Sequence, residues 1–365
     1  MWGKLFGRGP SEYGLHIEPS GENLRAATGE SLLQTALKAG LAFPHNCRVG
    51  GCGECKCRLV SGKVKELTDK SYLLSAEELQ QGFILACQSR PLSDVVVEVT
   101  MRPLAVEHPV VDTTGDIVAI TPMTGDILRL ELVLADDLAY NAGQCAELSV
   151  PPGADAASAP PAGVSRRYSF ASAPSAERPR RVDFFIRKVT GGAFTEWLFA
   201  HAKVGTRLRV RGPQGQFGLV PGSEPMLCVA GGSGLAPIKA VLEQAIAERQ
   251  ANRPLTIVFG ARTHADLYGL DDIDQIRRQW GGRFRFVPIL SAEPEGSAWS
   301  GARGMVADQL PGLLGERLGE QHAWLCGPPP MVDACTTALQ QAGAAMAQIH
   351  QDKFLDASHG VAAAA

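Results

Sequence analysis

The segment CRVGGCGECKC, residues 47–57, places four of the chain's nine cysteines and three glycines within eleven residues. The N-terminal MWGKLFGRGPSEYG lacks the apolar core of a signal peptide, and no stretch approaches the ~18 uninterrupted apolar residues of a membrane span. We therefore expect a cytoplasmic protein that does not bind a membrane. Thiols stay reduced in that compartment, so clustered cysteines indicate metal binding or catalysis rather than a disulfide framework.

The cysteines follow the spacing C-x4-C-x2-C, with a further cysteine in FILACQSRPL, residues 83–92. This spacing is typical of a plant-type [2Fe–2S] cluster held by four thiolates. The predicted ligands are Cys47, Cys52, Cys55 and Cys87. Glycines at 50, 51 and 53 can adopt positive φ and bring backbone N–H groups close to the cluster sulfides.

Two other metal sites fit the cysteines less well. A structural zinc site usually has two C-x2-C pairs, and this segment has one. A Rieske centre requires two histidine ligands, and His45 has no counterpart near Cys87. Cys57 begins KCRLVSGKV, which alternates like a strand, so we interpret Cys57 as a strand residue near the cluster and not as a ligand.

Helix and strand signals surround the cysteine segment. GESLLQTALKAG, residues 29–40, predicts a short helix that starts at Glu30 or Ser31 and stops at Gly40. DVVVEV, residues 94–99, predicts a closing strand. Residues 1–101 therefore resemble a plant-type ferredoxin domain of the β-grasp fold.

A second region follows a linker within MRPLAVEHPVVDT, residues 101–113. Short alternating segments punctuated by turns predict an antiparallel β-barrel over residues 108–220. They include GDIVAITPMTGDILRLELVLA, GQCAELSV, RRYSFASAP, RVDFFIRKV and RLRVRGPQGQFGL. The Pro- and Ala-rich residues 151–165 lie between two of these strands and are interpreted as a long surface loop.

The pattern changes after PGSEP, residues 221–225. Apolar runs alternate with helical stretches, which predicts a doubly wound parallel α/β sheet over residues 224–356. The predicted strands are MLCVAG, LTIVFGA, RFRFVPIL, GMVADQL and AWLCG. In the helix after MLCVAG, apolar residues at 238, 241, 242, 245 and 246 share one face. Residues 357–365 are expected to be a disordered tail.

Two glycine-containing stretches could bind phosphates. VTGGAFTEWLFAHA leads into a helix at Thr195, whose N-terminus would suit a pyrophosphate; the alternative is a tight turn with Thr195 as a simple N-cap. AGGSGLAP follows a strand and opens a helix, with Pro237 in its first turn. Its alternative is that the glycines only let the helix pack on the sheet. It is not G-x-G-x-x-G, and no acidic residue ends the strand TIVFGAR, which disfavours a conventional Rossmann dehydrogenase.

R-x-Y-S at Arg166, GPQGQFGL, AGGSGLAP and LCGPPPM occur in that order. Together they resemble the ferredoxin–NADP reductase superfamily. With the N-terminal ferredoxin-like region, residues 12–356 resemble the reductase components of bacterial aromatic-ring dioxygenases and multicomponent monooxygenases. This domain order implies FAD, because the phthalate-dioxygenase type carries its ferredoxin at the C-terminus and uses FMN.

The resemblance implies roles for individual residues. Arg166, Tyr168 and Ser169 would contact the FAD phosphates, the isoalloxazine and flavin N5 respectively. Cys326 and Gly327 would lie near the nicotinamide, and IHQDKF, with Asp352 where many relatives have Glu, would bring Phe354 towards both rings. The remaining predicted cofactor contacts are Arg187, Gly192 and Thr195 for FAD, and Gly231, Gly232, Ser233 and Gly234 for the dinucleotide. Ser169, Cys326 and Phe354 are the predicted catalytic residues.

NADH delivers two electrons as a hydride, an iron–sulfur cluster accepts one at a time, and a flavin can do both. We expect electrons to pass from NADH to FAD, to the [2Fe–2S] cluster and then to a terminal oxygenase or its ferredoxin. The net charge of −3 argues against a nucleic-acid partner. NADH is expected over NADPH because Arg262 is the single nearby cation and Asp266 would repel a 2′-phosphate. The alternatives are a reductase of the same architecture for an iron–sulfur dehydrase in deoxysugar synthesis, and a ferredoxin-like binding module that senses nucleotides.

Overall fold

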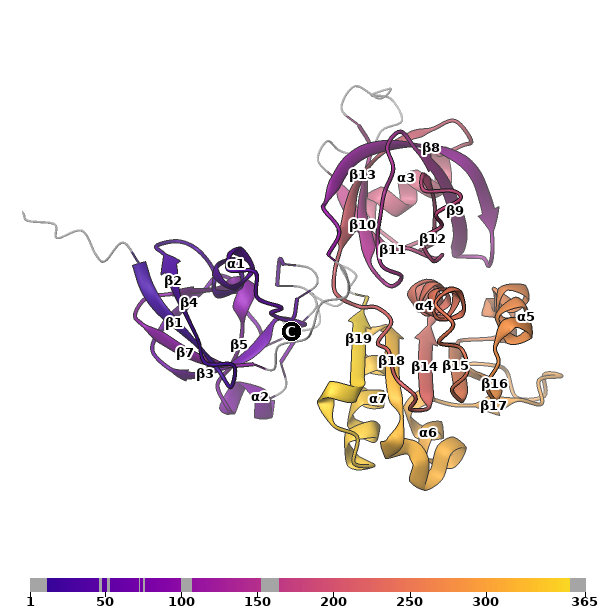
Figure 1. The fold of residues 1–365 in the computed structure, drawn as a ribbon. Helices are drawn as coiled ribbons and strands as arrows, with labels where there is room; N and C mark the ends of the chain where they lie inside the picture. Colours follow the sequence, from indigo (N-terminus) through magenta and orange to yellow (C-terminus); the bar gives the residue numbers. More distant parts are fainter. Residues whose placement is uncertain are drawn as a thin grey trace, which may run out of the picture. The chain divides into compact units, whose positions relative to one another are not determined.

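The structure is a computed structural model that describes residues 12–45, 48–50, 53–71, 73–74, 76–99, 107–151 and 164–354. These residues form two compact units, one up to residue 99 and one from residue 107 to residue 354 (Figure 1). The second unit contains both a barrel and a parallel sheet. The predicted domain limits at 1–101, 108–220 and 224–356 stay predictions. Among the described residues, no helix is long and apolar enough to cross a lipid bilayer.

The first unit is built on a five-stranded sheet in the order β2-β1-β7-β3-β5. β1 and β2 form an antiparallel hairpin, and β1 pairs in parallel with β7. The strands are β1 (Glu12–Glu18), β2 (Glu22–Ala27), β3 (Lys56–Ser61), β5 (Phe83–Leu85) and β7 (Val95–Glu98), with β4 (Val64–Glu66) and β6 (Ser89–Pro91) paired separately. The strands predicted at KCRLVSGKV and DVVVEV are confirmed.

Helix α1 (Leu32–Lys38) packs on this sheet, and α2 (Ala76–Gln80) and the 3₁₀ helix η1 (Ala86–Gln88) follow later. Ser31 is the N-cap of α1. Its Oγ accepts from the Gln34 N–H at 3.2 Å, and Gln34 Oε1 accepts from the Ser31 N–H at 2.9 Å. This reciprocal pair satisfies two of the free donors at the helix start. Gly40 follows with φ +75°. The predicted helix is confirmed, with Ser31 as its cap.

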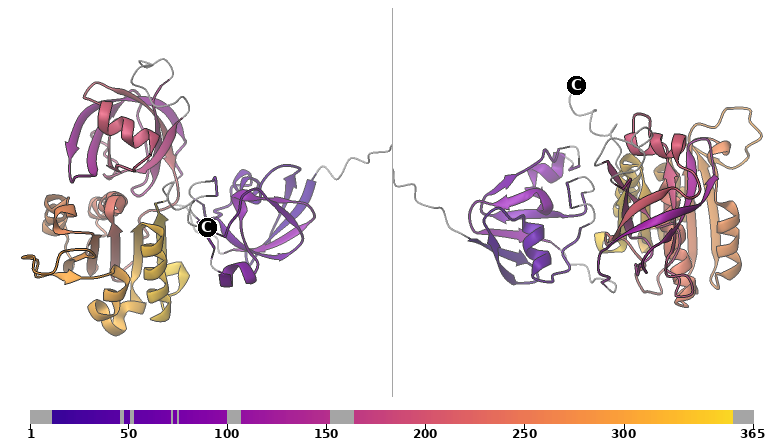
Figure 2. Two further views of the ribbon diagram at one scale, coloured as in Figure 1. Left: turned by 180° about the vertical axis from the view of Figure 1, so that it is seen from behind. Right: turned by 90° about the horizontal axis from the view of Figure 1, so that it is seen from above.

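The barrel is a six-stranded antiparallel sheet in the order β11-β10-β13-β8-β9-β12. A bridge between Phe170 and Phe184 joins its two edges. The strands are β8 (Val111–Pro122), β9 (Ile127–Leu134), β10 (Cys145–Ser149), β11 (Ser165–Ser169), β12 (Arg181–Arg187) and β13 (Arg207–Gln214). Helix α3 (Ala193–His201) lies at the barrel (Figure 2). Its residues Phe194, Trp197 and Leu198 belong to the barrel core. The predicted antiparallel barrel is confirmed.

The parallel sheet has the strand order β17-β16-β15-β14-β18-β19. Its strands are β14 (Met226–Gly231), β15 (Leu255–Ala261), β16 (Phe284–Leu290), β17 (Ala302–Arg303), β18 (His322–Gly327) and β19 (Ile349–Lys353). Its α-helices are α4 (Leu235–Ala247), α5 (Leu270–Gln279), α6 (Val306–Leu314) and α7 (Pro329–Gln341), and 3₁₀ turns lie at η2 (Gly232–Gly234), η3 (His264–Asp266), η4 (Gly315–Glu320) and η5 (Met346–Gln348).

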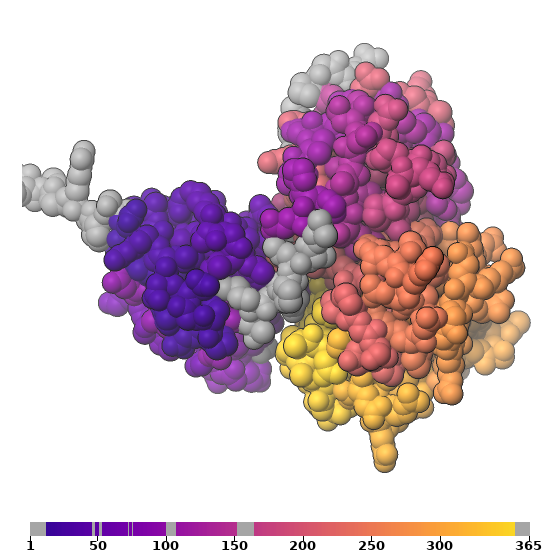
Figure 3. Space-filling view, viewed as in Figure 1, coloured from indigo at the N-terminus to yellow at the C-terminus, as the bar shows by residue number. Residues whose placement is uncertain are grey.

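Alternate residues of β14 point to opposite faces of the sheet, which is the two-residue period of a strand. Met226 and Cys228 share a core with α4 and α5, whereas Leu227 and Val229 share one with α6 and α7. The doubly wound arrangement is thereby confirmed. The barrel and this sheet meet along α4 (Figure 3).

Two local predictions are wrong. GMVADQL is not a strand, because Val306 and Leu310 are buried four residues apart on helix α6, while Met305 at the N-cap is exposed. The helix after VTGG, predicted to begin at Thr195, begins at Ala193 with Gly192 as its N-cap. Thr195 therefore lies inside the first turn, and the alternative in which it caps the helix is wrong as well. Residues 152–163 of the loop predicted at 151–165, and the whole of the tail predicted at 357–365, lie outside the described residues.

Candidate functional site

The predicted nucleotide loop lies where β14 ends and α4 begins. A Cβ on Gly234 would stand 2.2 Å from the Cys326 carbonyl oxygen, so this close approach of helix and strand requires a glycine. Gly232 has φ +54°, and a Cβ there would meet nothing within 4 Å. Gly234 thus serves packing, which was the alternative interpretation, whereas Gly232 exposes backbone to open space, as a phosphate cradle requires.

Strand β18 ends beside this loop. Cys326 is fully buried. Gly327 has φ +147°, and a Cβ added to it would stand 3.0 Å from the Gly231 oxygen. Tyr268, which sequence reasoning missed, donates from its hydroxyl to the Gly232 oxygen at 2.9 Å. Phe185 and Phe259 pack edge-on against the Tyr268 ring, and burial raises its pKa well above the usual value. Tyr268 therefore acts here as a neutral donor that fixes the loop.

The C-terminal strand brings further predicted residues to this edge. The Phe354 N–H donates to the Gly327 oxygen at 2.9 Å, and Ser169 Oγ donates to Asp352 Oδ2 at 3.2 Å with both residues buried. Lys353 pairs with Asp333 on α7 at 2.6 Å and anchors the strand. A serine from the barrel thus meets β19 beside the ends of β14 and β18, although Ser169 and Asp352 are 183 residues apart.

The R-x-Y-S residues lie on β11, where alternate side chains share a face. Arg166 is exposed and donates to the Ser165 oxygen at 2.7 Å. The Tyr168 ring lies 5.8 Å from Phe194, and burial raises its pKa above the usual value. The Tyr168 hydroxyl is buried and finds no hydrogen-bond partner among the residues that the structure describes. Since buried hydroxyls are nearly always bonded, this one fits a bound polar group such as FAD.

The start of α3 is organised by Thr195. Its Oγ1 accepts from the Val189 N–H at 3.1 Å and donates to the Gly192 oxygen at 3.1 Å. The hydroxyl therefore folds the turn, and the first N–H groups of the helix, which have no partner within it, are what could face a pyrophosphate. Arg187 pairs with Asp126 at 2.8 Å. The predicted FAD contacts at Arg187, Gly192 and Thr195 stay predictions.

Half of the predicted cluster ligands lie within the described residues of the first unit. Cys55 and Cys87 are buried, and the Cys87 N–H donates to Cys55 Sγ at 3.4 Å. Gln88 Nε2 lies 3.7 Å from Cys87 Sγ. Cys47 and Cys52 fall outside the described residues. The two adjacent thiols and the N–H aimed at sulfur fit the soft thiolate ligation of a [2Fe–2S] cluster.

Other features of this segment agree with the prediction. Gly50 and Gly53 have φ of +79° and +74°, as predicted for a loop that turns its N–H groups inward. Both ring nitrogens of His45 have protein partners, the Phe43 oxygen at 2.8 Å and Arg48 Nη2 at 2.9 Å, which disfavours His45 as a ligand. Cys57 lies on β3, and burial raises its thiol pKa to about 12.

Comparison with known proteins gives relatives over nearly the whole chain. The electron transfer component of xylene/toluene monooxygenase from Pseudomonas putida is 38% identical over 352 residues, which are 94% of each chain. The chain belongs to the family of oxygenase reductase components. The reductase component of phenol 2-monooxygenase from Pseudomonas sp. is 34% identical, over 95% of this reductase and 96% of the relative.

Family profiles and solved structures agree with this assignment. The profile of the 2Fe-2S iron-sulfur cluster binding domain matches residues 15–92, that of the oxidoreductase FAD-binding domain matches 117–218, and that of the oxidoreductase NAD-binding domain matches 228–337. The Amycolatopsis cytochrome P450 reductase GcoB superposes with a TM-score of 0.70 at 34% identity, over 94% of this reductase and 98% of that chain. The ferredoxin reductase in carbazole 1,9a-dioxygenase gives 0.66 at 31%, with the same coverage. The reductase is thus an oxidoreductase with FAD-, NAD(P)- and 2Fe-2S-binding domains.

Proposed function

We propose that this reductase passes electrons from NADH through FAD and a [2Fe–2S] cluster to the terminal oxygenase, or its ferredoxin, of an aromatic- or hydrocarbon-hydroxylating system in the cytoplasm. The observation that carries the proposal is the meeting of Ser169 with Asp352 and β19, because it joins the R-x-Y-S strand to the edge that holds Cys326 and Gly327. The names of the relatives support an oxygenase as the acceptor.

Each part of the site has a task in this proposal. FAD, when bound, accepts a hydride and releases electrons singly. Arg166 and the start of α3 would hold its phosphates, and Tyr168 would pack against its ring and gain a partner for its buried hydroxyl. Gly231 to Gly234 would hold the dinucleotide, with the Gly232 backbone fixed by Tyr268. Ser169 would hydrogen-bond the flavin edge, and the cysteine thiolates would hold the cluster.

The preference for NADH rests on the loop after β15. Asp266 Oδ2 accepts from the Thr263 N–H at 2.8 Å, and Glu293 Oε2 accepts from the His264 N–H at 2.7 Å. The hydrogen bond from His264 lowers the pKa of Glu293, so this carboxylate stays charged at neutral pH. Two carboxylates thus bond the backbone of the two residues that follow the exposed Arg262. Their charge would oppose a 2′-phosphate in this position.

The test is a comparison of kcat/KM for NADH and NADPH with cytochrome c as the acceptor. We expect the wild type to prefer NADH, and Glu293→Gln to reduce that preference because one repelling charge is lost. Arg278→Gln, on the surface of α5 and outside this loop, is the matched control and should keep the wild-type ratio. Equal or higher kcat/KM with NADPH in the wild type would overturn the preference. A bound flavin that NADH does not reduce would overturn the reductase function itself and favour a nucleotide sensor.

A further inference from the structure

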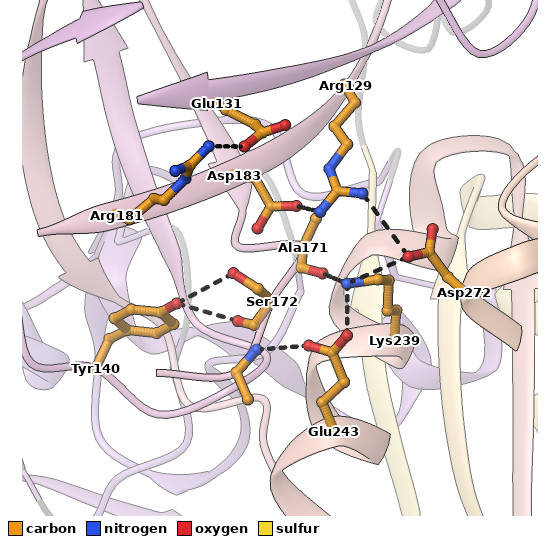
Figure 4. A network of polar contacts seen from close by, with 11 residues as sticks. Arg129, Glu131, Tyr140, Ala171, Ser172, Arg181, Asp183, Lys239, Glu243 and Asp272 are labelled. Atoms are coloured by element: carbon orange, nitrogen blue, oxygen red, sulfur yellow. Dashed lines mark hydrogen bonds and ion pairs between the residues drawn. The ribbon is translucent and has the colours of Figure 1, made fainter. Parts of the chain in front are cut away.

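Two side chains of α4 hold the segment that follows the R-x-Y-S strand. Lys239 Nζ donates to the Ala171 oxygen at 2.8 Å and pairs with Glu243 Oε1 at 2.6 Å. Glu243 Oε2 accepts from the Ala173 N–H at 3.0 Å (Figure 4). Because Lys239 and Glu243 are one helical turn apart, they lie on one face of α4 and hydrogen-bond the two ends of the tripeptide Ala171–Ala173.

Further polar contacts lie on both sides of these two hydrogen bonds. On the barrel side, the Tyr140 hydroxyl donates to the Ser172 oxygen at 3.1 Å, in the middle of the tripeptide. On the sheet side, Lys239 Nζ lies 4.0 Å from Asp272 Oδ1 on α5, which is also 3.7 Å from Arg129 of the barrel (Figure 4). Gln244 of α4 accepts from the Ala142 N–H at 2.8 Å. The barrel and the sheet are therefore joined by directional polar contacts.

The burial of Lys239 calls for an explanation beyond stability. Its side chain is 3% exposed, and removing an ammonium group from water is costly. Its partner Glu243 is half-buried, with 32% of its side chain exposed. Replacing a buried ion pair by apolar side chains is often neutral or stabilising, so the partly buried pair is weak support for stability alone. The pair does fix the position of the tripeptide on α4, because its hydrogen bonds join the Ala171 oxygen and the Ala173 N–H.

That geometry links two parts of the proposed site. Lys239 lies five residues after Gly234, or about 7.5 Å along the helix axis from the nucleotide loop. Ala171 lies two residues after Ser169, whose hydroxyl contacts Asp352. One helix therefore carries the dinucleotide loop at its start and holds the flavin-side segment by its second turn.

We propose that Lys239 and Glu243 are positioning residues for hydride transfer: they fix Ala171–Ala173 on α4 and so set the nicotinamide site relative to the flavin site. The inference rests on the proposed function. Neither residue takes part in bond making, since both are fully engaged with the backbone and with each other. Their loss should therefore slow flavin reduction more than it weakens NADH binding.

The test is the double variant Lys239→Met/Glu243→Met in the holoenzyme. Removing both charges together leaves neither one buried alone, which should preserve folding. We expect the rate constant of flavin reduction at saturating NADH to fall by about 10- to 100-fold, as for a small misplacement of reacting groups. The Kd of NADH should stay within about twofold, because no dinucleotide contact is changed. Amide hydrogen exchange in the peptide around Ala171–Ala173 should rise.

The matched control is Glu66→Met/Lys70→Met, which removes an ion pair of the same i, i+4 spacing from the first unit. It should leave both the flavin reduction rate and the exchange of that peptide at wild-type values. Faster exchange with an unchanged reduction rate would reduce the network to a structural role and overturn the inference. Unchanged exchange would show that the pair does not hold the segment, with the same consequence.

Two further outcomes are separable. If the double variant does not fold, the single variant Glu243→Gln, which keeps an amide oxygen but removes the charge that pairs with Lys239, must slow flavin reduction without weakening NADH binding, or the inference fails. If NADH does not reduce the wild-type flavin, the proposed function fails instead, and the exchange measurement alone decides whether the network holds the segment.

Discussion

Substitutions at Gly232 and Gly234 should separate cofactor binding from helix packing. Gly232 lies in the left-handed region with open space around its missing Cβ. Asn tolerates this region better than other residues, so Gly232→Asn should fold with little loss of stability. Its side chain would project into the space assigned to the dinucleotide phosphates. We expect the Kd of NADH to rise at least about tenfold, which corresponds to about 1.4 kcal/mol.

Gly234→Ala should act through packing. Gly234 has an ordinary helical φ of −61°, so the substitution adds no backbone strain of its own. Its Cβ would lie 2.2 Å from the Cys326 oxygen and 2.6 Å from the Cys326 carbonyl carbon, both main-chain atoms that cannot rotate away. Overpacking of this kind costs about 1–3 kcal/mol, which lowers Tm by roughly 2–12 °C in a unit of this size.

The assays are thermal unfolding followed by circular dichroism and titration of the oxidised holoenzyme with NAD⁺ or of the FAD-depleted chain with NADH. The expected pattern is a near-wild-type Tm with weak binding for Gly232→Asn, and a lowered Tm for Gly234→Ala. Wild-type affinity in Gly232→Asn would refute the phosphate cradle. An unchanged Tm in Gly234→Ala would refute the requirement for glycine at the contact with β18.

Two further predictions concern the cluster and the pH dependence of stability. Cys87→Ser should weaken or lose the cluster, because an alkoxide is a poor substitute for a thiolate on iron. NADH-dependent ferricyanide reduction should then stay near wild type, while cytochrome c reduction falls sharply. An unchanged ratio of the two rates in iron-free protein would contradict the linear electron path. Burial lowers the pKa of His322 in the folded chain. The contribution of neutral His322 to stability should therefore be present above about pH 6.5. It should be lost as the pH falls, because the unfolded chain then binds a proton at this histidine that the folded chain does not. Urea unfolding at pH 7.5 and 5.5 should therefore show a smaller loss of stability in His322→Phe than in wild type, and equal losses would contradict the assignment.

Sequence patterns predicted the elements whose signals are local. The capping of α1 by Ser31 requires only residues within one turn, and the strands of the barrel follow their own alternation. The strand prediction at GMVADQL is wrong because its large apolar residues, Met305, Val306 and Leu310, are too few in a short stretch to tell a strand period from a helix period. The helix predicted from Thr195 starts two residues earlier, because Gly192, which has no side chain to mark it as a cap, takes the N-cap position. The Thr195 hydroxyl bonds to the preceding turn instead.

The contacts between the barrel and the sheet could not be predicted in the same way. The partner of Lys239 is a backbone oxygen 68 residues earlier, and its position depends on how two separately folded sheets pack. One sequence signal for this burial does exist. From Leu235 to Leu242 every residue of α4 except Lys239 is apolar, and a helix that is apolar all round is buried on all sides. A lysine within such a helix must be buried with it, and a buried ammonium requires a carboxylate and further acceptors. Glu243, one turn later, is the carboxylate that the helix itself supplies, so the remaining acceptor had to come from whatever covers the outer face of α4, which is the barrel.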